Sequence, residues 1–498
     1  MVTTSCPVRR QAARGAGGAA LVWGTDRWTW SALDREVAVT CGRLRARGIV
    51  PGSRVAVLAA NHPATVVLLF ALRRLGASLL ALGARASTVE LRAQCERGRP
   101  CLVLADAERL DRIPGAEPLE PWVGQAGEPW AGDGSDPAAD WALLFTSGTT
   151  GRPKGAQLPV SALDALARAS AANLHPRPGD RWLCNLPLFH IGGLAMAIRC
   201  AHDGATLVLQ PRFDAESMVR AIRELEITHL SVVARTLEQA LDAGLAAAGL
   251  RAVLAGGGPV PPSLVERARA SGLPLLLTYG LTEACSQVTT ERPGEADGRT
   301  AGPPLPGLAV RILDGSGASA LPGEEGAIAV RGPTLMRGYL DDPGASAEAL
   351  RDGWLHTGDV GRLDPSGRLT VYARRTDLIL SGGENVYPAE VEAVLATHPG
   401  VAEVAVVGRS DPRWGQVPVA VVVRRADVSL DDLRPWARAR LAGFKVPAEV
   451  FPVAALPRTA AGKVDRARVA AAVADPRGAC ASEKPSGAES TAVRLEFK

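Results

Sequence analysis

The chain lacks the cysteine and histidine patterns that mark disulfide frameworks and histidine-bound metals. Its eight cysteines are scattered over 498 residues with no CxxC pair and no regular spacing, and its seven histidines form no HxxxH pair. Isolated thiols in a chain of this length are typical of the reducing cytosol rather than of small secreted proteins. We therefore expect a cytoplasmic protein, and no histidine pair that would bind zinc.

Strong charge and long apolar runs are also absent. The net charge is only +4 and the arginines are spread out, so nothing indicates a nucleic-acid partner. Residues 1–20 contain no apolar core segment, which excludes a signal peptide within them. The most apolar stretch, Val66–Leu82, is interrupted by Arg73, Arg74 and Gly76. We expect it to form a buried amphipathic helix rather than a membrane span.

What is present indicates a globular protein with more than one domain. Hydrophobic residues make up 47% of the chain, enough for a large core. From Trp23 onward, short apolar runs alternate with helical patterns, which favours parallel sheets covered by helices. Asn61 is expected to cap one of these helices. Near residue 300 the runs become short strands between Gly/Pro turns, which predicts a small β-rich subdomain.

One stretch has the composition of a phosphate-binding loop. The apolar run Leu143–Phe145 leads into TSGTTGRPKG at Thr146–Gly155. Glycines let backbone N–H groups approach an anion, hydroxyls add donors, and the lysine supplies positive charge. The stretch is not a Walker motif, because Gly155 rather than Ser or Thr follows Lys154. It predicts a strand that ends in a loop for a nucleotide phosphate.

This loop resembles the phosphate loop of the adenylate-forming superfamily, which includes acyl-CoA ligases, amino-acid adenylation domains and luciferases. The resemblance covers roughly residues 20–470, with about six motifs in the family's order. It implies ATP, Mg²⁺ and CoA as ligands, all of them small molecules. The loop positions expected to bind ATP are Thr146, Ser147, Gly148, Thr149, Thr150, Gly151 and Lys154.

The resemblance also implies a division of the α/β fold. A large N-terminal AMP-binding domain of helix-covered sheets, with the small β-rich subdomain, would be followed by a small mobile α/β domain that carries a catalytic lysine. The expected segments are a flexible tail (1–20), the AMP-binding domain (21–373), a hinge (374–377), the catalytic-lysine domain (378–474) and a disordered tail (475–498). The sequence gives no indication of oligomeric state.

The motif YGLTE at Tyr279–Glu283 follows a predicted strand. By the resemblance, Tyr279 stacks on adenine, Thr282 contacts the phosphate as a catalytic residue, and Glu283 holds Mg²⁺. A lone carboxylate suits Mg²⁺, which takes one or two protein oxygens together with phosphates and waters.

Three further motifs complete the expected nucleotide site. In AGGGP, the backbone at Gly257 and Gly258 is expected to line the nucleotide pocket. In HTGD, the resemblance implies that Asp359 accepts hydrogen bonds from both ribose hydroxyls, for which an acceptor-only carboxylate is suited. Arg374 stands where the family has a ribose-binding arginine, and Thr376 occupies the hinge position, where many relatives carry Asp or Lys.

The C-terminal region contains motifs for both halves of a two-step reaction. PRTAAGKVDR resembles the family motif whose lysine, here Lys463, is catalytic in adenylation. SGGENVYP resembles the loop that enters the site for the second step, where Gly382 and Gly383 leave room for the pantetheine arm of CoA. Lys445, in the family element FKVP, is a further CoA-binding candidate. Since both loops cannot occupy one site, the small domain is expected to rotate about the hinge.

The acid substrate is most closely indicated by PLFHIGGL at Pro187–Leu194, a motif common in CoA ligases. Amino-acid adenylation domains place an Asp there, and no carrier segment follows, so an amino-acid-loading module is disfavoured. Together with AGGGPVP, YGLTEACSQV and LILSGGENVYPAEVE, the motif looks most like the 2-succinylbenzoate–CoA ligases of menaquinone biosynthesis. Their substrate has a second carboxylate, which calls for a basic or hydroxyl group. The candidate pocket residues are His190, Gly192, Arg199, Arg235 and Ser286.

The predicted function is therefore ATP-dependent acid–CoA ligation, through acyl-AMP with release of pyrophosphate and then a thioester with release of AMP. A fatty-acid or aryl-acid CoA ligase is the alternative. A non-catalytic homologue is disfavoured by the presence of Lys463, Glu283 and Asp359. For Arg199 and Arg235 a surface ion pair is the competing interpretation.

Overall fold

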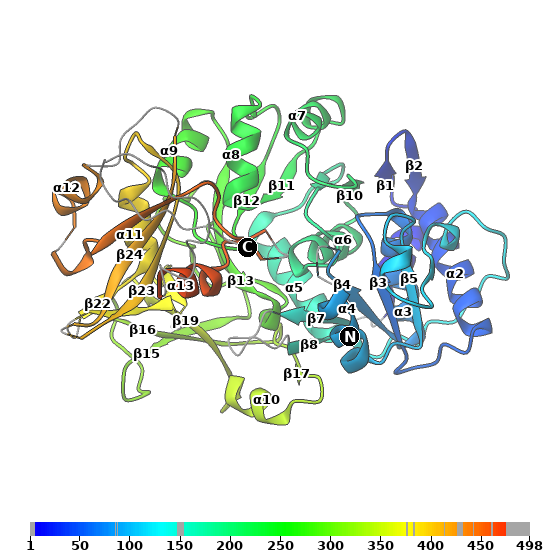
Figure 1. Ribbon diagram of the computed structural model, residues 1–498. Helices are drawn as coiled ribbons and strands as arrows, with labels where there is room; N and C mark the ends of the chain where they lie inside the picture. Colours follow the sequence, from blue (N-terminus) through cyan, green and yellow to red (C-terminus); the bar gives the residue numbers. More distant parts are fainter. Residues whose placement is uncertain are drawn as a thin grey trace, which may run out of the picture.

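The structure is a computed structural model that describes residues 5–84, 86, 88–146, 154–374, 377–381, 384–412, 414–425, 432–441, 443–459 and 462–474 (Figure 1). Three sheets with their helices form a large domain, which extends to residue 374. A small domain follows from residue 377 and lies at the left of Figure 1. The predicted α/β class, with helix-covered sheets, a β-rich subdomain and a small C-terminal α/β domain, is confirmed.

The first sheet has eight strands in the order β14-β13-β12-β11-β9-β10-β1-β2, parallel except at its two edges. Strands β10, β11 and β12 are buried along their length because helices cover both faces. Helices α7, α8 and α9 share one apolar core on one face, and α5 and α6 belong to the main core on the other. The strands are β1 (Ala19–Trp23), β2 (Asp26–Thr29), β9 (Arg181–Cys184), β10 (Thr206–Leu209), β11 (His229–Val232), β12 (Ala252–Ala255), β13 (Leu275–Leu281) and β14 (Ser286–Thr290). The helices are α5 (Val160–Leu174), α6 (Ile191–Asp203), α7 (Ala215–Glu224), α8 (Ala234–Asp242) and α9 (Pro262–Ala270), with the single-turn η3 (Thr282–Ala284) after β13.

The second sheet has seven strands in the order β17-β8-β7-β4-β3-β5-β6. Its strands are β3 (Arg54–Leu58), β4 (Ser78–Leu82), β5 (Leu102–Ala105), β6 (Glu117–Pro118), β7 (Asp140–Thr146), β8 (Lys154–Pro159) and β17 (Gly338–Tyr339). The helices around it are α2 (Trp30–Ala46), α3 (Pro63–Leu75), α4 (Thr88–Gly98), η1 (Leu110–Arg112) and η2 (Glu120–Trp122).

The apolar stretch Val66–Leu82 differs from its prediction. Helix α3 ends at Leu75 because Gly76 takes a left-handed conformation (φ 65°), and the remainder becomes strand β4. Every residue of α3 is buried, so the helix is not amphipathic. Its arginines tolerate burial because each has a carboxylate partner: Arg73 lies 2.6 Å from Asp164, and Arg74 pairs with Asp34. Among the described helices, none has both the length and the apolarity to cross a membrane.

The N-terminal residues are also better ordered than predicted. Residues Pro7–Ala13 form helix α1, with Cys6 and Val8 fully buried. The side-chain amide of Gln11 donates to the backbone carbonyl of His202 over 2.9 Å, at the end of α6. The prediction of a loose tail over residues 1–20 is therefore wrong for residues 5–20, because this short helix packs into the main core. The predicted tail at 475–498 lies outside the described residues.

The third sheet of the large domain directly precedes the small domain in sequence. It runs β15-β16-β19-β18, with β20 paired to β19, and contains β15 (Ala309–Leu313), β16 (Glu325–Arg331), β18 (Leu350–Arg351), β19 (Trp354–Leu363) and β20 (Leu369–Arg374), beside helix α10 (Pro343–Ala349). The small domain has its own sheet, β22-β21-β24-β23 with β25 paired to β24, and an apolar core on each face. Its elements are β21 (Ile379–Ser381), β22 (Glu384–Val386), α11 (Pro388–Leu395), β23 (Val401–Asp411), β24 (Gly415–Arg424), α12 (Leu433–Arg438), η5 (Gly443–Lys445), β25 (Glu449–Val453) and α13 (Arg466–Ala474).

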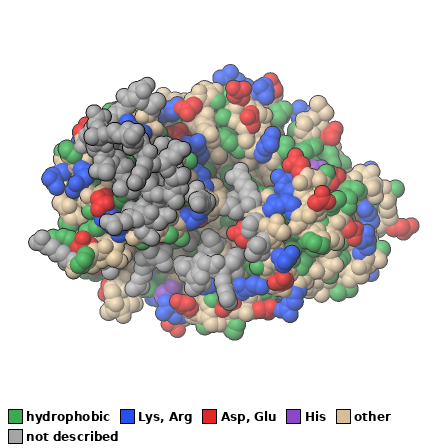
Figure 2. Space-filling model, viewed as in Figure 1, with side chains coloured by type: hydrophobic (Ala, Val, Ile, Leu, Met, Phe, Trp, Pro, Cys, Tyr) green, Lys and Arg blue, Asp and Glu red, His purple; other side chains and the backbone are tan. Residues whose placement is uncertain are grey.

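The surface carries charges of both signs. Basic and acidic side chains are interspersed over the face drawn in Figure 2, as the small net charge and scattered arginines predict. The junction of the two domains lies between β20 and β21, which brackets the predicted hinge at 374–377. Thr376 is outside the described residues, so its hinge role stays a prediction.

Candidate active site

Two predicted nucleotide-binding residues meet where the first and third sheets join. Tyr279 lies near the end of β13, and Asp359 lies in β19. The phenol of Tyr279 donates a hydrogen bond to Oδ2 of Asp359 over 2.7 Å, and both residues are at most 9% exposed. On the neighbouring strand β20, Arg374 is the register partner of Asp359. The fold therefore brings together the three positions that the resemblance assigns to adenine and ribose.

A second cluster surrounds Glu283, in the turn η3 that follows β13. Its Oε1 accepts hydrogen bonds from the hydroxyl of Tyr339 over 2.9 Å and from Oγ1 of Thr146 over 3.4 Å. The ammonium of Lys154 lies 5.3 Å from the centre of the Tyr339 ring, within reach of a cation–π contact. The predicted metal-binding carboxylate thus contacts one end of the predicted phosphate loop directly and is linked to the other end through Tyr339.

The loop itself connects two antiparallel strands. Thr146 ends β7 and Lys154 begins β8, and these two residues are register partners. The intervening ATP-binding candidates lie outside the described residues: Ser147, Gly148, Thr149, Thr150 and Gly151. Because both ends are held beside Glu283, the loop starts and finishes next to the carboxylate expected to hold Mg²⁺.

Sequence reasoning missed Tyr339, which is the hydroxyl donor to Glu283. It reaches the site because β17 pairs with β8 at the edge of the second sheet. The chain has only four tyrosines, Tyr279, Tyr339, Tyr372 and Tyr387. The last two stack across the domain junction with ring centres 4.9 Å apart. All four tyrosines lie in the second half of the chain. Because tyrosine is so rare in this sequence, each one, including Tyr339, was a candidate for closer attention.

Two glycines of the motifs are required by the backbone, Gly280 by a close approach and Gly257 by a left-handed conformation. A Cβ built on Gly280 would lie 1.7 Å from the carbonyl oxygen of Ser286, so only glycine allows β13 and β14 to pair there. Gly257 has a left-handed φ of 77° and lies against the side chain of Val233. Gly257 and Gly258 follow the end of β12 after one intervening residue, and β12 pairs with the strand that carries Tyr279. Thr282 opens η3, immediately before Glu283.

The PLFHIGGL motif forms a tight turn into α6. His190 precedes the helix, its ring packs against Phe189 at 4.6 Å between ring centres, and Gly192 lies in the first helical turn. A Cβ on Gly193 would lie 2.3 Å from the carbonyl oxygen of Pro187, so the turn cannot accept a larger residue. His190 and Gly192 therefore lie in one turn, and their role in an acid pocket stays a prediction.

Asn61 holds this turn, which is a role the sequence did not indicate. Its amide donates to the carbonyl oxygen of Leu186, and its Oδ1 accepts from the N–H of Leu188 over 2.8 Å. The prediction that Asn61 caps the next helix is wrong. His62 is the cap of α3, through Nδ1 and the N–H of Ala64, because Asn61 lies one residue too early.

The other three pocket candidates lie in different surroundings. Arg199 is buried in the second half of α6, where it donates to Gln287 over 2.8 Å and lies over the ring of Trp182. Burial lowers the pKa of its guanidinium to about 10. Ser286 begins β14 opposite Leu281.

Arg235, in the first turn of α8, is half exposed and lies 3.2 Å from Glu403 of the small domain. Both arginines thus have protein partners of their own. Their predicted contact with a second carboxylate stays a prediction.

The small domain presents the predicted catalytic lysine in a hairpin. Arg458 and Val464 are bridge partners, and the N–H of Thr459 donates to the carbonyl oxygen of Lys463 over 2.8 Å. The side chain of Lys463 is exposed. Among the CoA-binding candidates, Lys445 lies 2.7 Å from both carboxylate oxygens of Glu390. Gly382 and Gly383 lie outside the described residues.

The residues around Glu283 fit Mg²⁺. Over the described ranges, no group of three or more His, Cys, Asp or Glu side chains is arranged to hold a metal by itself. Mg²⁺ does not need such a group, because it binds one or two carboxylates and completes its shell with phosphates and waters. Glu283 and the neighbouring Thr146 hydroxyl offer the hard oxygen donors that this ion prefers.

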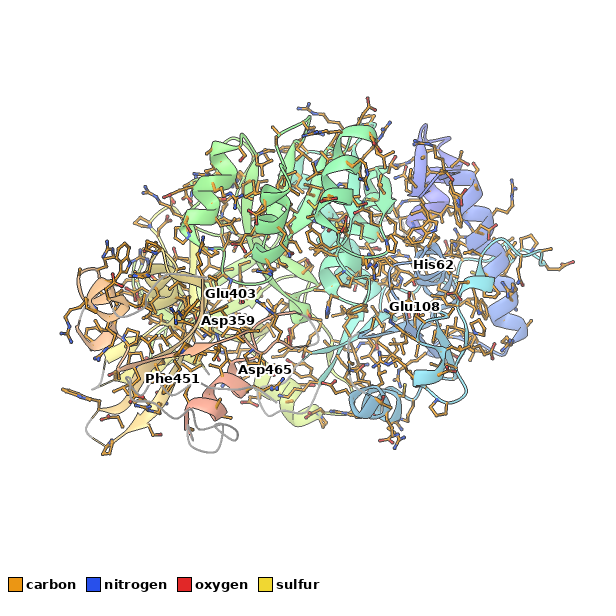
Figure 3. All side chains as sticks on the ribbon, turned by 45° about the horizontal axis from the view of Figure 1, so that its top comes forward. His62, Glu108, Asp359, Glu403, Phe451 and Asp465 are labelled. Atoms are coloured by element: carbon orange, nitrogen blue, oxygen red, sulfur yellow. The ribbon has the colours of Figure 1, made fainter. Side chains whose placement is uncertain are left out.

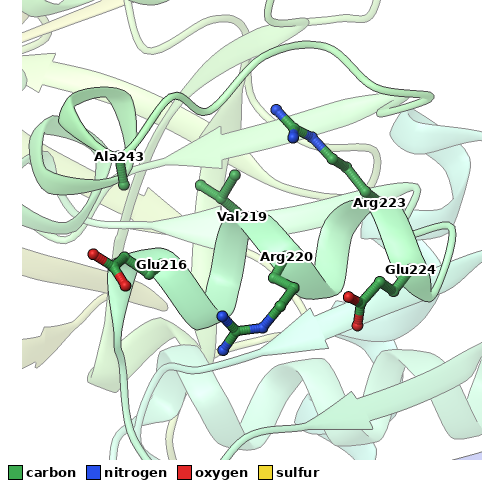
Figure 4. Close-up of a pocket in the computed structure, with 6 residues that line it drawn as sticks. All are labelled: Glu216, Val219, Arg220, Arg223, Glu224 and Ala243. Atoms are coloured by element: carbon green, nitrogen blue, oxygen red, sulfur yellow. The ribbon is translucent and has the colours of Figure 1, made fainter.

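A separate open hollow lies on the outside of α7 (Figure 4). It is lined by Glu216, Val219, Arg220, Arg223, Glu224 and Ala243. None of these residues belongs to the predicted site. Because two arginines and two glutamates line the hollow, it favours neither an anionic nor a cationic ligand. We assign it no function.

Family models and individual proteins agree on the relationship of this chain. The model of the AMP-binding enzyme matches residues 8–340, and the model of the AMP-binding enzyme C-terminal domain matches residues 390–463. The chain is 39% identical over 459 residues to the 2-succinylbenzoate–CoA ligase of Bacillus licheniformis, covering 90% of this chain and 95% of the relative. It is 40% identical over 426 residues to that of Bacillus velezensis, covering 84% and 87%.

Solved structures also match this chain over most of its length. The o-succinylbenzoate CoA synthetase (MenE) of Bacillus subtilis, in complex with the acyl-adenylate intermediate OSB-AMP, matches with a TM-score of 0.88 and 35% identity, over 93% of this chain and 98% of that one. ATP-bound MatB from Rhodopseudomonas palustris matches with the same TM-score of 0.88 and 27% identity, over 94% and 99%.

Proposed function

Because the chain belongs to the AMP-binding enzyme family, we infer that it joins a carboxylic acid to coenzyme A in two ATP-dependent steps. In the first step the acid attacks the α-phosphate of ATP, giving acyl-AMP and pyrophosphate. In the second, the thiol of CoA displaces AMP. We propose 2-succinylbenzoate as the acid, which places the enzyme in menaquinone biosynthesis.

The observation that carries this choice of acid is sequence identity over nearly the whole chain. The fold does not separate the possibilities, since the MenE and MatB structures match with equal TM-scores of 0.88. Sequence identity does distinguish the two structures, because the chain is 35% identical to MenE and 27% identical to MatB. Its identity to the 2-succinylbenzoate–CoA ligase of B. licheniformis is 39%. The PLFHIGGL turn supports an acyl-CoA ligase. A fatty-acid or aryl-acid ligase remains the second candidate.

The first step must bring a carboxylate up to a polyphosphate. Two like charges about 4 Å apart repel by roughly 4 kcal/mol at an effective dielectric constant of about 20. Lys154, beside the phosphate loop, and Lys463, on the small-domain hairpin, supply positive charge against this repulsion. Mg²⁺ bound at Glu283 would neutralise phosphate charge and so make the α-phosphate easier to attack.

The nucleotide is held by the Tyr279–Asp359 pair. The carboxylate of Asp359 is suited to accept both ribose hydroxyls, and the hydrogen bond from Tyr279 fixes its orientation. The ring of Tyr279 is at the same time the predicted stacking surface for adenine. No protein nucleophile is needed, because phosphate activation makes AMP the leaving group.

The second step requires the small domain to turn. Lys463 and the segment at Gly382–Gly383 are expected to enter the same site in succession, so the domain would rotate about residues 374–377. Lys445 and the two glycines are the proposed contacts for CoA.

We also propose that the enzyme works in the cytoplasm with small-molecule substrates only. The described cysteines are all free thiols, five of them buried. Burial raises the pKa of Cys184 to about 12, so this thiol stays protonated and unreactive.

The test is CoA-thioester formation from ATP and a panel of acids. The panel contains 2-succinylbenzoate, benzoates, coumarate and medium-chain fatty acids, with thioester and AMP both measured. We expect 2-succinylbenzoate to give the highest kcat/KM. If it were inert while a fatty or aryl acid turned over well, the substrate proposal would be wrong but the ligase proposal would stand. Inactivity with every acid, in a folded protein that binds ATP, would overturn both.

A further inference from the structure

We propose that Glu403 is a positioning residue for acyl-AMP formation, because it links the hairpin that carries Lys463 to the large domain. The link consists of Arg235 in the large domain, and Glu403 and Arg458 in the small domain. It deepens the proposed ligase function and rests on it. Figure 3 shows Glu403 on the side of the small domain that faces the large domain, near Asp359 in that view.

On the small-domain side, one guanidinium joins the hairpin to Glu403. Nη1 of Arg458 donates to the carbonyl oxygen of Gly462 over 3.0 Å, and Nη2 donates to Oε2 of Glu403 over 2.5 Å. Gly462 directly precedes Lys463. The N–H of Gly462 also donates to the carbonyl oxygen of Thr459, which closes the hairpin. The position of the lysine is therefore coupled to Glu403 through a single side chain.

On the large-domain side, the other oxygen of the same carboxylate is used. Oε1 of Glu403 lies 3.2 Å from Nη1 of Arg235, in the first turn of α8. This turn begins directly after Val233, whose side chain lies against Gly257. The link thus ends beside the glycine loop expected to line the nucleotide pocket. It joins Arg235 to Glu403, which are 168 positions apart in sequence.

The strength of the link suits a contact that must break in each cycle. The side chains of Arg235, Glu403 and Arg458 are 50%, 27% and 34% exposed, so water and salt weaken the ion pairs. Two guanidiniums on one carboxylate still favour the docked hairpin over an undocked one. A weak bias of this kind promotes the first step without preventing the rotation needed for the second.

The link also gives Arg235 a use other than binding the acid. A carboxylate already in contact with its guanidinium competes with any substrate carboxylate. Arg235 is also 3.8 Å from Glu238 on its own helix, a second acceptor on the same side. Its charge is therefore engaged by the protein in the arrangement described.

The experiment separates the two half-reactions in the variants Glu403→Gln and Arg235→Ala. Acyl-AMP formation is followed as pyrophosphate release without CoA, and thioester formation is followed from supplied 2-succinylbenzoyl-AMP and CoA. We expect each variant to slow the first step about two- to fivefold, the range of one or two surface ion pairs, and to leave the second unchanged or faster. The double variant should be no slower than the more affected single variant.

Glu449→Gln is the matched control. Glu449 pairs with Arg409 at 2.5 Å in a surface ion pair of the same kind, but both residues belong to the small domain, so its loss should alter neither step. Raising the salt concentration should reduce the difference between wild type and Glu403→Gln, because screening removes the link from the wild type too. Equal slowing of both steps, or none in either variant, would overturn the proposal.

A second readout requires no acid. Trypsin cleavage after Arg458, followed by mass spectrometry, reports how often the hairpin leaves Glu403. Cleavage should be faster in Glu403→Gln than in wild type or Glu449→Gln, and equal rates would contradict the link. If no acid were activated by the wild type, the proposed function would fail while this measurement would still decide whether Glu403 holds the hairpin.

Discussion

The hydroxyl of Tyr279 lies 2.7 Å from Oδ2 of Asp359, a contact that joins the end of the eight-stranded sheet to the third sheet. The two residues are 80 positions apart in sequence. Because the pair is buried, the phenol fixes the direction of the carboxylate that we propose as the acceptor for ribose. Binding then requires little reorganisation of the protein.

Removing this hydroxyl should weaken ATP binding. In Tyr279→Phe the stacking ring is kept and the hydrogen bond is lost, which leaves Asp359 with one donor fewer. We expect the KM for ATP to rise roughly tenfold, since hydrogen bonds to charged groups contribute about 1.5–3 kcal/mol. The control is Tyr387→Phe, which removes a phenol bond of 2.6 Å to Glu325 at the domain junction. An unchanged KM in Tyr279→Phe would argue against the pre-orientation of Asp359.

Neutralising Glu283 should act through magnesium. Glu283→Gln keeps an acceptor for Tyr339 but removes the charge, so the fold should be retained. We expect the Mg²⁺ concentration for half-maximal acyl-AMP formation to rise roughly tenfold or more. Tyr339→Phe keeps the carboxylate and should produce a smaller shift. The measurement is a Mg²⁺ titration of acyl-AMP formation in both variants. If the half-maximal Mg²⁺ concentration rose equally in both, Glu283 would not be the residue that binds the ion.

Lys463→Ala should separate the two reactions. The side chain extends from the exposed hairpin of the small domain, so its truncation should not disturb the core. We expect acyl-AMP formation to fall on the order of 10²–10³-fold, the effect of removing one preorganised charge from a transition state. Supplied acyl-AMP should still react with CoA at the wild-type rate. Loss of both reactions in a folded protein would refute the proposed division of roles.

The pH dependence of stability should include a contribution from Asp203, the last residue of α6. Burial is the main cause that raises its pKa from 3.8 to about 7; Arg199 partly opposes this shift and nearby Asp180 adds to it. The folded state therefore holds a proton that the unfolded state has released, and stability falls as the pH rises from about 4 to about 7. A negative charge at a helix C-terminus adds to the effect.

Asp203→Asn removes this titration. We expect the variant to be more stable than wild type at pH 8 by about 4 kcal/mol and by less than about 1 kcal/mol at pH 4. Urea unfolding at the two pH values measures the difference. Asp242→Asn, at the exposed end of α8 in an ion pair with Arg267, is the control and should leave the pH dependence as in wild type. If Asp203→Asn raised the free energy of unfolding equally at both pH values, Asp203 would not be the titrating group.

Much of the fold could be predicted because it follows from local patterns. The parallel sheets were recognisable from buried apolar runs such as Ala252–Ala255, which alternate with helical segments. Errors arose where packing overrides local preference. Helix α1 looks like a polar tail but is held by the main core, and Gly76 divides one apolar run into a helix and a strand.

By itself, the sequence determined which chemistry we propose for the nucleotide site, since Thr146, Glu283, Asp359 and Lys463 belong to motifs whose residue types and order are readable along the chain. Only the tertiary structure decided which side chains complete that site. Tyr339 reaches Glu283 through the pairing of β17 with β8, and Arg235 meets Glu403 across the domain junction. The physical reason is that such contacts join residues far apart in the chain, so no local pattern records them. They exist only once the sheets and the two domains have packed together.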